Sequence, residues 1–218
     1  KDRTIEISGA GYAPNGEFHE NDEKIDPLED EDLELLLRIG ALNNDAHLQE
    51  NNGSWVCFGD PTEGALVTSA AKAGLKRREL EEKYPRVGEI PFDSTRKRMT
   101  TIHRTPEGKL FAYVKGAPEI LLDLSKHIVD EGIREIGEED LKEKHAEMKS
   151  MAADALRVLG MAYRELPDDY DLEDLDVKEL EGELTFVGMQ GMIDPARDEV
   201  PDAIRVAQLA GIRPVMVT

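Results

Sequence analysis

Three short segments rich in strand-forming residues follow one another in the middle of the chain, with polar turns between them. They are Arg86–Phe92, Met99–His103 and Leu110–Lys115. Thr105–Gly108, which joins the last two, has the composition of a tight turn. This pattern predicts three antiparallel strands. Helical periodicity before and after them indicates an α+β fold, an antiparallel sheet flanked by helices.

The flanking segments carry the helix signals. Apolar residues between Leu33 and Asn44 fall at helical spacing. Asp60 is a good N-cap and Pro61 suits the first helical position, so we expect a helix to begin there. Further elements are predicted as a helix from Pro118, a helix over about Glu138–Ala155 and a strand over Arg157–Tyr163.

The sequence changes character at Leu184, where an apolar segment typical of a buried strand begins. With a helix over about Glu199–Ala210 and a strand over Arg213–Val217, it forms a predicted β-α-β unit. Parallel strands present ligands at their carboxyl ends, which here lie near Asp194 and Thr218. We therefore expect a fragment with a boundary near residue 188 and two domains, residues 1–188 and residues 189–218.

Charge is distributed unevenly along the chain. The net charge is -20, yet Ser94–Lys115 holds six Lys or Arg against one Glu. Such a basic island on an acidic protein predicts an anionic ligand, whereas the overall charge argues against nucleic acid and anionic membranes as partners. Two acidic runs, Glu17–Glu34 and Glu165–Glu183, each hold ten acidic residues against one Lys, and we expect them to be solvated.

Metal, disulfide and membrane signals are missing from the sequence. Cys57 is the only cysteine, so no internal disulfide forms, and the five His are not at metal-ligand spacing. No run of 18 apolar residues occurs that would predict a transmembrane helix. There is also no Gly-x4-Gly-Lys-Ser/Thr loop, no complete Gly-x-Gly-x-x-Gly and no Ser/His/Asp arrangement.

The strand Leu110–Lys115 contains the first candidate site residue. Period-two alternation places Phe111, Tyr113 and Lys115 on one face, so a cation ends an aromatic face. Gly116, the next residue, permits a sharp turn and close approach of a ligand. The alternative is a lysine that only extends into solvent at a strand end.

Phe92 follows Pro91 directly before a polar turn, a poor place for a core ring. A base that stacked on it would gain about 1–3 kcal/mol, and one charge-assisted hydrogen bond would add about 1.5–3 kcal/mol. The alternative is that Phe92 belongs to the core.

Glu63 likewise has two interpretations, a ligand contact or a capping box with Asp60. Arg157 could reach phosphates or pair with nearby acids.

Five ordered motifs resemble the P-type cation-transporting ATPases, most closely the calcium-pump branch, over nearly the whole chain. They are Gly59–Leu66, Phe92–Met99, Lys115–Glu119, Asp154–Arg157 and Gly191–Arg197. The resemblance implies a cytoplasmic nucleotide-binding domain of an integral membrane protein, followed by the start of the second half of the phosphorylation domain, which has a haloacid-dehalogenase-like Rossmann fold. The other domains of the pump, phosphorylation, actuator and transmembrane, would be its partners.

The resemblance also implies the nucleotide-binding residues. They are Thr62, Glu63, Phe92, Lys97, Met99, Lys115, Gly116 and Arg157. Phe92 would stack on adenine and Met99 would pack the adenine wall. Lys115 would line the pocket floor, and Glu63 with Thr62 would contact the base side.

By the same resemblance, Lys97 and Arg157 would face the phosphates of ATP. Asp194, Arg197 and Thr218 would surround the phosphorylation site and hinge. The Asp-Lys-Thr-Gly-Thr segment with the phosphorylated aspartate is missing, so this chain should bind ATP without turning it over. Mg²⁺ would act in the full-length protein, whose ATP hydrolysis drives cation transport.

One departure concerns Ser94, where the muscle-type pump has Arg, so Arg96 and Arg98 are candidate replacements for a phosphate contact.

Two other functions remain open. The β-α-β unit around Asp194 also suits a haloacid-dehalogenase-like phosphatase with a large cap, although no Asp-x-Asp nucleophile follows a strand. A non-enzymatic alternative is an acidic interaction module whose basic island docks a partner protein.

Overall fold

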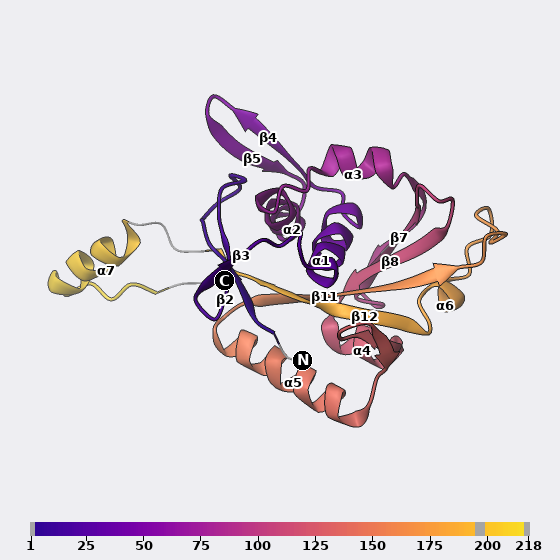
Figure 1. Cartoon of the computed structure of the whole chain (residues 1–218). Helices are drawn as coiled ribbons and strands as arrows, with labels where there is room; N and C mark the ends of the chain where they lie inside the picture. Colours follow the sequence, from indigo (N-terminus) through magenta and orange to yellow (C-terminus); the bar gives the residue numbers. More distant parts are fainter. Residues whose placement is uncertain (1–2, 195–198, 216–218) are drawn as a thin grey trace.

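The computed structural model describes residues 3–194 and 199–215. Its strands are β1 (Ile5–Ile7), β2 (Phe18–Glu20), β3 (Glu23–Ile25), β4 (His47–Asn51), β5 (Ser54–Phe58), β6 (Arg86–Asp93), β7 (Arg98–Arg104), β8 (Leu110–Gly116), β9 (Ser125–Val129), β10 (Ile133–Glu135), β11 (Arg157–Leu166) and β12 (Leu184–Met192). Its helices are α1 (Glu31–Leu42), α2 (Pro61–Lys72), α3 (Arg77–Lys83), α4 (Pro118–Leu124), α5 (Glu138–Ala153), α6 (Val177–Leu180) and α7 (Val200–Leu209). Figure 1 shows their arrangement.

A seven-stranded sheet with the order β10-β9-β12-β11-β8-β7-β6 forms the centre of the molecule. All neighbouring pairs in it are antiparallel except β12 and β9, which are parallel. The three strands predicted from Arg86 to Lys115 are β6, β7 and β8, and they are neighbours. The expected α+β class is therefore confirmed, and the sheet, which was expected to be antiparallel, contains one parallel pair.

Helices cover both faces of the sheet, as Figure 1 shows. Tyr113 of β8 packs in one apolar cluster with Leu37 of α1 and Leu66 of α2. Its neighbour Val114 packs in another cluster with Leu121 of α4. Consecutive strand residues point to opposite faces, so the predicted alternation along β8 is confirmed.

The first turns of α1 and α2 are held by aspartate caps. Asp30 accepts hydrogen bonds from the backbone N–H groups of Asp32 and Leu33. Asp60 does the same for Thr62 and Glu63, and Pro61 occupies the start of α2. The predicted N-cap of the second helix is confirmed, and it fixes the direction in which the side chains of that first turn point.

The C-terminal part differs from the expected β-α-β unit. The boundary expected near residue 188 falls inside β12, which stays paired with β11 as far as Met192. This strand therefore belongs to the large sheet. Helix α7 is present as predicted, has no buried residue and lies to one side of the rest in Figure 1. Of the expected last strand, residues 213–215 are not in regular structure, and the remainder lies outside the described residues.

Within the described residues, no helix combines the length and the apolar character that crossing a bilayer requires.

Candidate functional site

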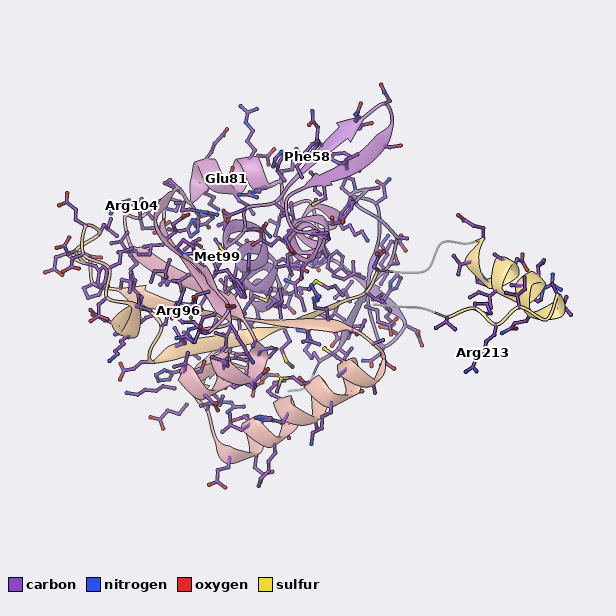
Figure 2. All side chains as sticks on the ribbon, turned by 180° about the vertical axis from the view of Figure 1, so that it is seen from behind. Phe58, Glu81, Arg96, Met99, Arg104 and Arg213 are labelled. Atoms are coloured by element: carbon purple, nitrogen blue, oxygen red, sulfur yellow. The ribbon has the colours of Figure 1, made fainter. Side chains whose placement is uncertain are left out.

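A row of three candidate residues crosses the strands β6, β7 and β8. Met99 and Lys115 are direct partners in the register of β7 and β8. On the other side of β7, the pairing shifts between Ile90 and Asp93, so that Pro91 and Phe92 together oppose Met99. Such a bulge re-aims side chains at the sheet edge. Phe92, Met99 and Lys115 are therefore neighbours across the sheet, and Figure 2 labels Met99 within this hairpin.

These three residues differ sharply in exposure. The Phe92 ring is 62% exposed, whereas Met99 is 2% and Lys115 6% exposed. The alternative that Phe92 belongs to the core is therefore wrong. The alternative that Lys115 extends into solvent is wrong as well. An exposed ring next to a buried cation leaves an apolar surface that a flat ligand could cover.

The ammonium of Lys115 is held from two sides. It donates hydrogen bonds to a carboxylate oxygen of Glu63 and to the backbone carbonyl of Asn43. Burial lowers the pKa of Lys115, and the opposite charge of Glu63 acts in the other direction. Lys115 thus enters the site with its charge already compensated by the protein.

Glu63 does not form the capping box that its spacing from Asp60 allowed. One carboxylate oxygen accepts from Lys115, and the other accepts from the backbone N–H of Asp45 at 3.2 Å. The cap of α2 is made by Asp60 alone, with 2.8 Å to the N–H of Thr62. The capping-box interpretation is wrong because a buried cation attracts the carboxylate more strongly than an exposed backbone N–H.

Thr62, the neighbouring residue in the same helical turn, contacts the second predicted cation. Its hydroxyl oxygen accepts a hydrogen bond of 2.6 Å from the Arg157 guanidinium. The side chain of Arg157 is exposed at the start of β11. Burial raises the pKa of Asp60, but the hydrogen bonds from Thr62 and Glu63 and then the positive charge of Arg157 lower it below its ordinary value. The first turn of α2 therefore brings together Lys115 and Arg157, which are far apart in sequence.

Asn43 is a site residue that the sequence did not single out. It is fully buried at the end of α1, and its amide donates to the carbonyls of Met99 at 3.0 Å and Tyr113 at 2.8 Å. Its carbonyl also accepts from Lys115. Asn43 thus ties α1 to the row across β7 and β8. A polar residue directly after a helical run was its only sequence signal.

Gly116 does not form the sharp turn that was expected of it. It is the last residue of β8, paired with Arg98 and Gly160, and it does not have the positive φ of a sharp glycine turn. A Cβ at Gly116 would lie 2.5 Å from the carbonyl oxygen of Lys97. Glycine is therefore needed because the β6–β7 turn lies directly against the strand.

The turn between β6 and β7 carries the exposed Lys97, whose φ is +55°. Its backbone N–H donates to the carbonyl of Asp93 at 2.6 Å, and its carbonyl accepts from Ala117 at 3.1 Å. A left-handed conformation at a lysine costs energy that the surrounding contacts must offset. The turn thus holds Lys97 in one defined conformation beside Phe92.

Arg96 and Arg98 are engaged elsewhere. Both guanidiniums pair with Glu181, which also accepts from Thr100 at 2.8 Å. Glu181 is only 1% exposed, so the expectation that the whole acidic run Glu165–Glu183 is solvated is wrong at this residue. Because Arg98 and Met99 are consecutive in β7, their side chains leave opposite faces of the sheet. Neither arginine is available as a simple substitute for the Arg absent at Ser94.

The residues expected around the phosphorylation site are described only in part. Asp194 is exposed and lies two residues beyond Met192, the register partner of Arg157. Burial raises the pKa of the Tyr12 hydroxyl, and the charge of the Asp194 carboxylate raises it further. Arg197 and Thr218 lie outside the described residues.

Two cavities lie elsewhere on the same domain. One of about 310 Å³ is lined by aromatic and polar residues that include Arg38, Tyr84 and Phe111. The other, of about 450 Å³, adjoins the first turn of α1. Neither is lined by Phe92 or Lys115. The row across β6 to β8 thus combines the exposed Phe92 with the buried Met99 and Lys115.

Comparison with known proteins gives consistent matches. Residues 32–199 match the family described as "P-type ATPase, cytoplasmic domain N". The calcium-transporting ATPase of Bacillus subtilis (strain 168) is 38% identical over 217 residues, which is 99% of this chain and 24% of that protein. The cation-transporting ATPase pma1 of Synechocystis is 37% identical over 219 residues, with 98% and 24% covered. Calcium-transporting ATPase 1 of Bacillus cereus is 40% identical over 185 residues, with 84% and 20% covered. The chain thus spans about a quarter of the length of these relatives.

Proposed function

We propose that this chain, which belongs to the P-type ATPases as their cytoplasmic domain N, binds ATP. It would present the γ-phosphate to an aspartate outside these residues. The observation that carries the proposal is the first turn of α2. Its Glu63 holds Lys115 and its Thr62 holds Arg157, so one turn gathers two cations, and Lys115 lies in the same row across the sheet as the exposed ring of Phe92.

In this proposal the adenine covers Phe92, with Met99 and Lys115 forming the floor beside it. Stacking on the exposed ring would contribute about 1–3 kcal/mol. Lys115 shares its charge with Glu63, so it suits a polar base edge better than a phosphate. The phosphates would then be met by Lys97 and Arg157, both of which are exposed.

The proposal assigns no magnesium ligand to the described part of the chain. A search of those residues found no group of three or more His, Cys, Asp or Glu that could hold a metal ion. Mg²⁺ would belong to the phosphates of ATP and to the full-length protein.

We further propose that the whole protein is a cation pump, with calcium as the transported ion. The names of two of the relatives above, both calcium-transporting ATPases, support this choice. This chain would be a cytoplasmic domain of that membrane protein and would act with its phosphorylation, actuator and transmembrane domains. ATP bound here would be carried to the phosphorylated aspartate by closure of the domains, which supplies the reacting geometry.

The division into two domains is also part of the proposal. Because β12 remains in the large sheet as far as Met192, we place the start of the phosphorylation domain after this strand. Helix α7 supports this placement, since its apolar residues Ile204, Val206 and Leu209 are 40%, 60% and 79% exposed. They would be covered by the rest of a haloacid-dehalogenase-like Rossmann domain.

The test is a titration of the chain with ATP, followed by NMR, for the wild type and for Phe92→Ala and Lys115→Ala. We expect ATP to shift resonances around Phe92 and Lys115, and each substitution to weaken binding about tenfold or more, the equivalent of one lost stacking or charged contact. Phe58→Ala is the matched control because Phe58 is also exposed, at 47%, but lies on the β4–β5 hairpin. ATP that shifts none of these resonances would refute the proposal.

A further inference from the structure

We propose that Glu181 is a positioning residue for the nucleotide. Its buried carboxylate fixes the β6–β7 turn, residues 93–98, which carries Lys97 and follows Phe92 directly. The inference rests on the proposed function, because it concerns the same site. It assigns a role to a residue in the acidic run that contacts no part of the proposed ligand.

Glu181 collects three donors from β7 and the turn before it. Its carboxylate accepts from Arg98 at 2.6 Å, from Thr100 at 2.8 Å and from the guanidinium of Arg96. The partners are 81 to 85 residues away in sequence. Glu181 follows the last residue of α6, whose Leu180 is fully buried, so the helix anchors the carboxylate in the core.

The two guanidiniums also donate hydrogen bonds to backbone carbonyls and so connect Glu181 with the main chain of the turn. Arg96 donates from its other terminal nitrogen to the carbonyl of Pro91 at 2.7 Å, and Arg98 donates to the carbonyl of Arg96 at 2.9 Å. Pro91 is the residue directly before Phe92. A continuous chain of hydrogen bonds therefore connects Glu181 with the main chain on both sides of the exposed ring.

The turn needs such support because its own geometry is costly. Lys97 has a φ of +55°, a conformation that residues with a side chain rarely adopt. Within the turn, Asp93 accepts from the N–H groups of Thr95 at 2.9 Å and Arg96 at 2.8 Å. These local bonds define the turn, and the arginines that Glu181 holds attach it to the sheet.

The same contacts account for two of the six cations of the basic island. Arg96 and Arg98 have side chains that are 22% and 16% exposed, and both compensate one buried carboxylate. Without this carboxylate, the two neighbouring guanidiniums would repel each other, and they would move away from the backbone carbonyls to which they donate hydrogen bonds. Lys97 and Phe92 would then sample several positions, and each ligand contact would cost more ordering entropy.

The competing hypothesis is that Glu181 keeps the two arginines away from the phosphates of ATP. The two roles differ in what removal of the carboxylate does to different ligands. Loss of positioning weakens binding of ATP and of adenosine alike, since Phe92 loses its place. Release of two cations would strengthen ATP binding and leave adenosine unchanged.

The experiment measures the dissociation constants of ATP and adenosine by NMR titration for the wild-type chain and Glu181→Gln. We expect both constants to rise about tenfold, as for the loss of one charged hydrogen-bond network. Glu183→Gln is the matched control, because Glu183 is two residues away, exposed and paired only with Lys126 in the described contacts. Its constants should stay at the wild-type values.

Affinity is measured on the folded fraction, so a role in stability alone would lower the unfolding temperature and leave both constants unchanged. That result, or tighter binding of ATP, would overturn the inference. If Glu181→Gln does not fold, Thr100→Val removes one donor to the same carboxylate without changing charge, and unchanged constants there overturn it equally. A wild-type chain that binds neither ligand refutes the proposed function itself, and this inference with it.

Discussion

At the scale of single residues, the ion pair between Lys115 and Glu63 connects the sheet to the first turn of α2. The two side chains are 7% and 17% exposed, so both charges are largely removed from water. A pair of this kind contributes little net stability when complete but is costly to break on one side. Its value to the site is geometric, because it fixes the floor beside Phe92.

We therefore predict that Glu63→Ala destabilises the domain by about 3–5 kcal/mol, because it leaves the Lys115 ammonium buried without its counter-charge. Urea unfolding followed by tryptophan fluorescence would measure the loss. The double variant Glu63→Gln/Lys115→Met is the control, and it should recover most of the stability since no charge remains buried. Equal losses in the single and the double variant would contradict this account.

His103 provides a second prediction, on pH. It is 1% exposed, and its ring nitrogens contact the carbonyl of Tyr84 at 2.9 Å and the hydroxyl of Thr101 at 2.9 Å. A carbonyl can only accept, so Nδ1 donates and the neutral ring accepts from Thr101 through Nε2. Burial lowers the pKa of His103 to about 4.

The unfolded chain binds a proton at His103 near pH 6.5, and the folded chain only near pH 4. The stability contributed by the neutral ring is thus complete above about pH 6.5 and is lost as the pH falls toward 4, by about 2 kcal/mol between pH 7 and pH 5. In His103→Gln this part of the pH dependence should disappear. Unfolding curves of both proteins at several pH values test it, and parallel profiles would refute it.

At the scale of elements, α2 holds the two cations of the candidate site in place, because its first turn carries both Thr62 and Glu63. Asp60 fixes this turn through hydrogen bonds of 2.8 Å and 3.3 Å to their N–H groups. We predict that Asp60→Ala costs about 1 kcal/mol of stability and also weakens ATP binding. Asp60→Asn keeps an N-cap and should restore both properties. Thermal unfolding and the ATP titration are the measurements. Full ATP affinity in Asp60→Ala would contradict the role of this turn in positioning the two cations.

At the scale of the whole molecule, the chain consists of a packed body around the large sheet and the separate helix α7. A helix of ten residues without packing is marginal in water. We predict that the amides of Val200–Leu209 exchange with solvent nearly as fast as in a peptide, whereas those of α1 are strongly protected. Hydrogen exchange followed by NMR measures both helices in one sample. Equal protection would mean that α7 has a partner within this chain.

The sequence by itself determined the strands β6, β7 and β8 and the start of α2. These features depend on periodicity, turn residues and caps, which act between residues a few positions apart. Only the tertiary structure decided which charges pair. Lys115 and Glu63 are 52 residues apart, and Arg96 and Glu181 are 85 apart.

For the same reason, an acidic run that looked solvated contains a buried carboxylate, and a strand that looked like the start of a second domain joined the large sheet. The choice among many possible partners depends on which groups lose water together when helices and strands pack, and this is a property of the folded molecule and not of any local segment.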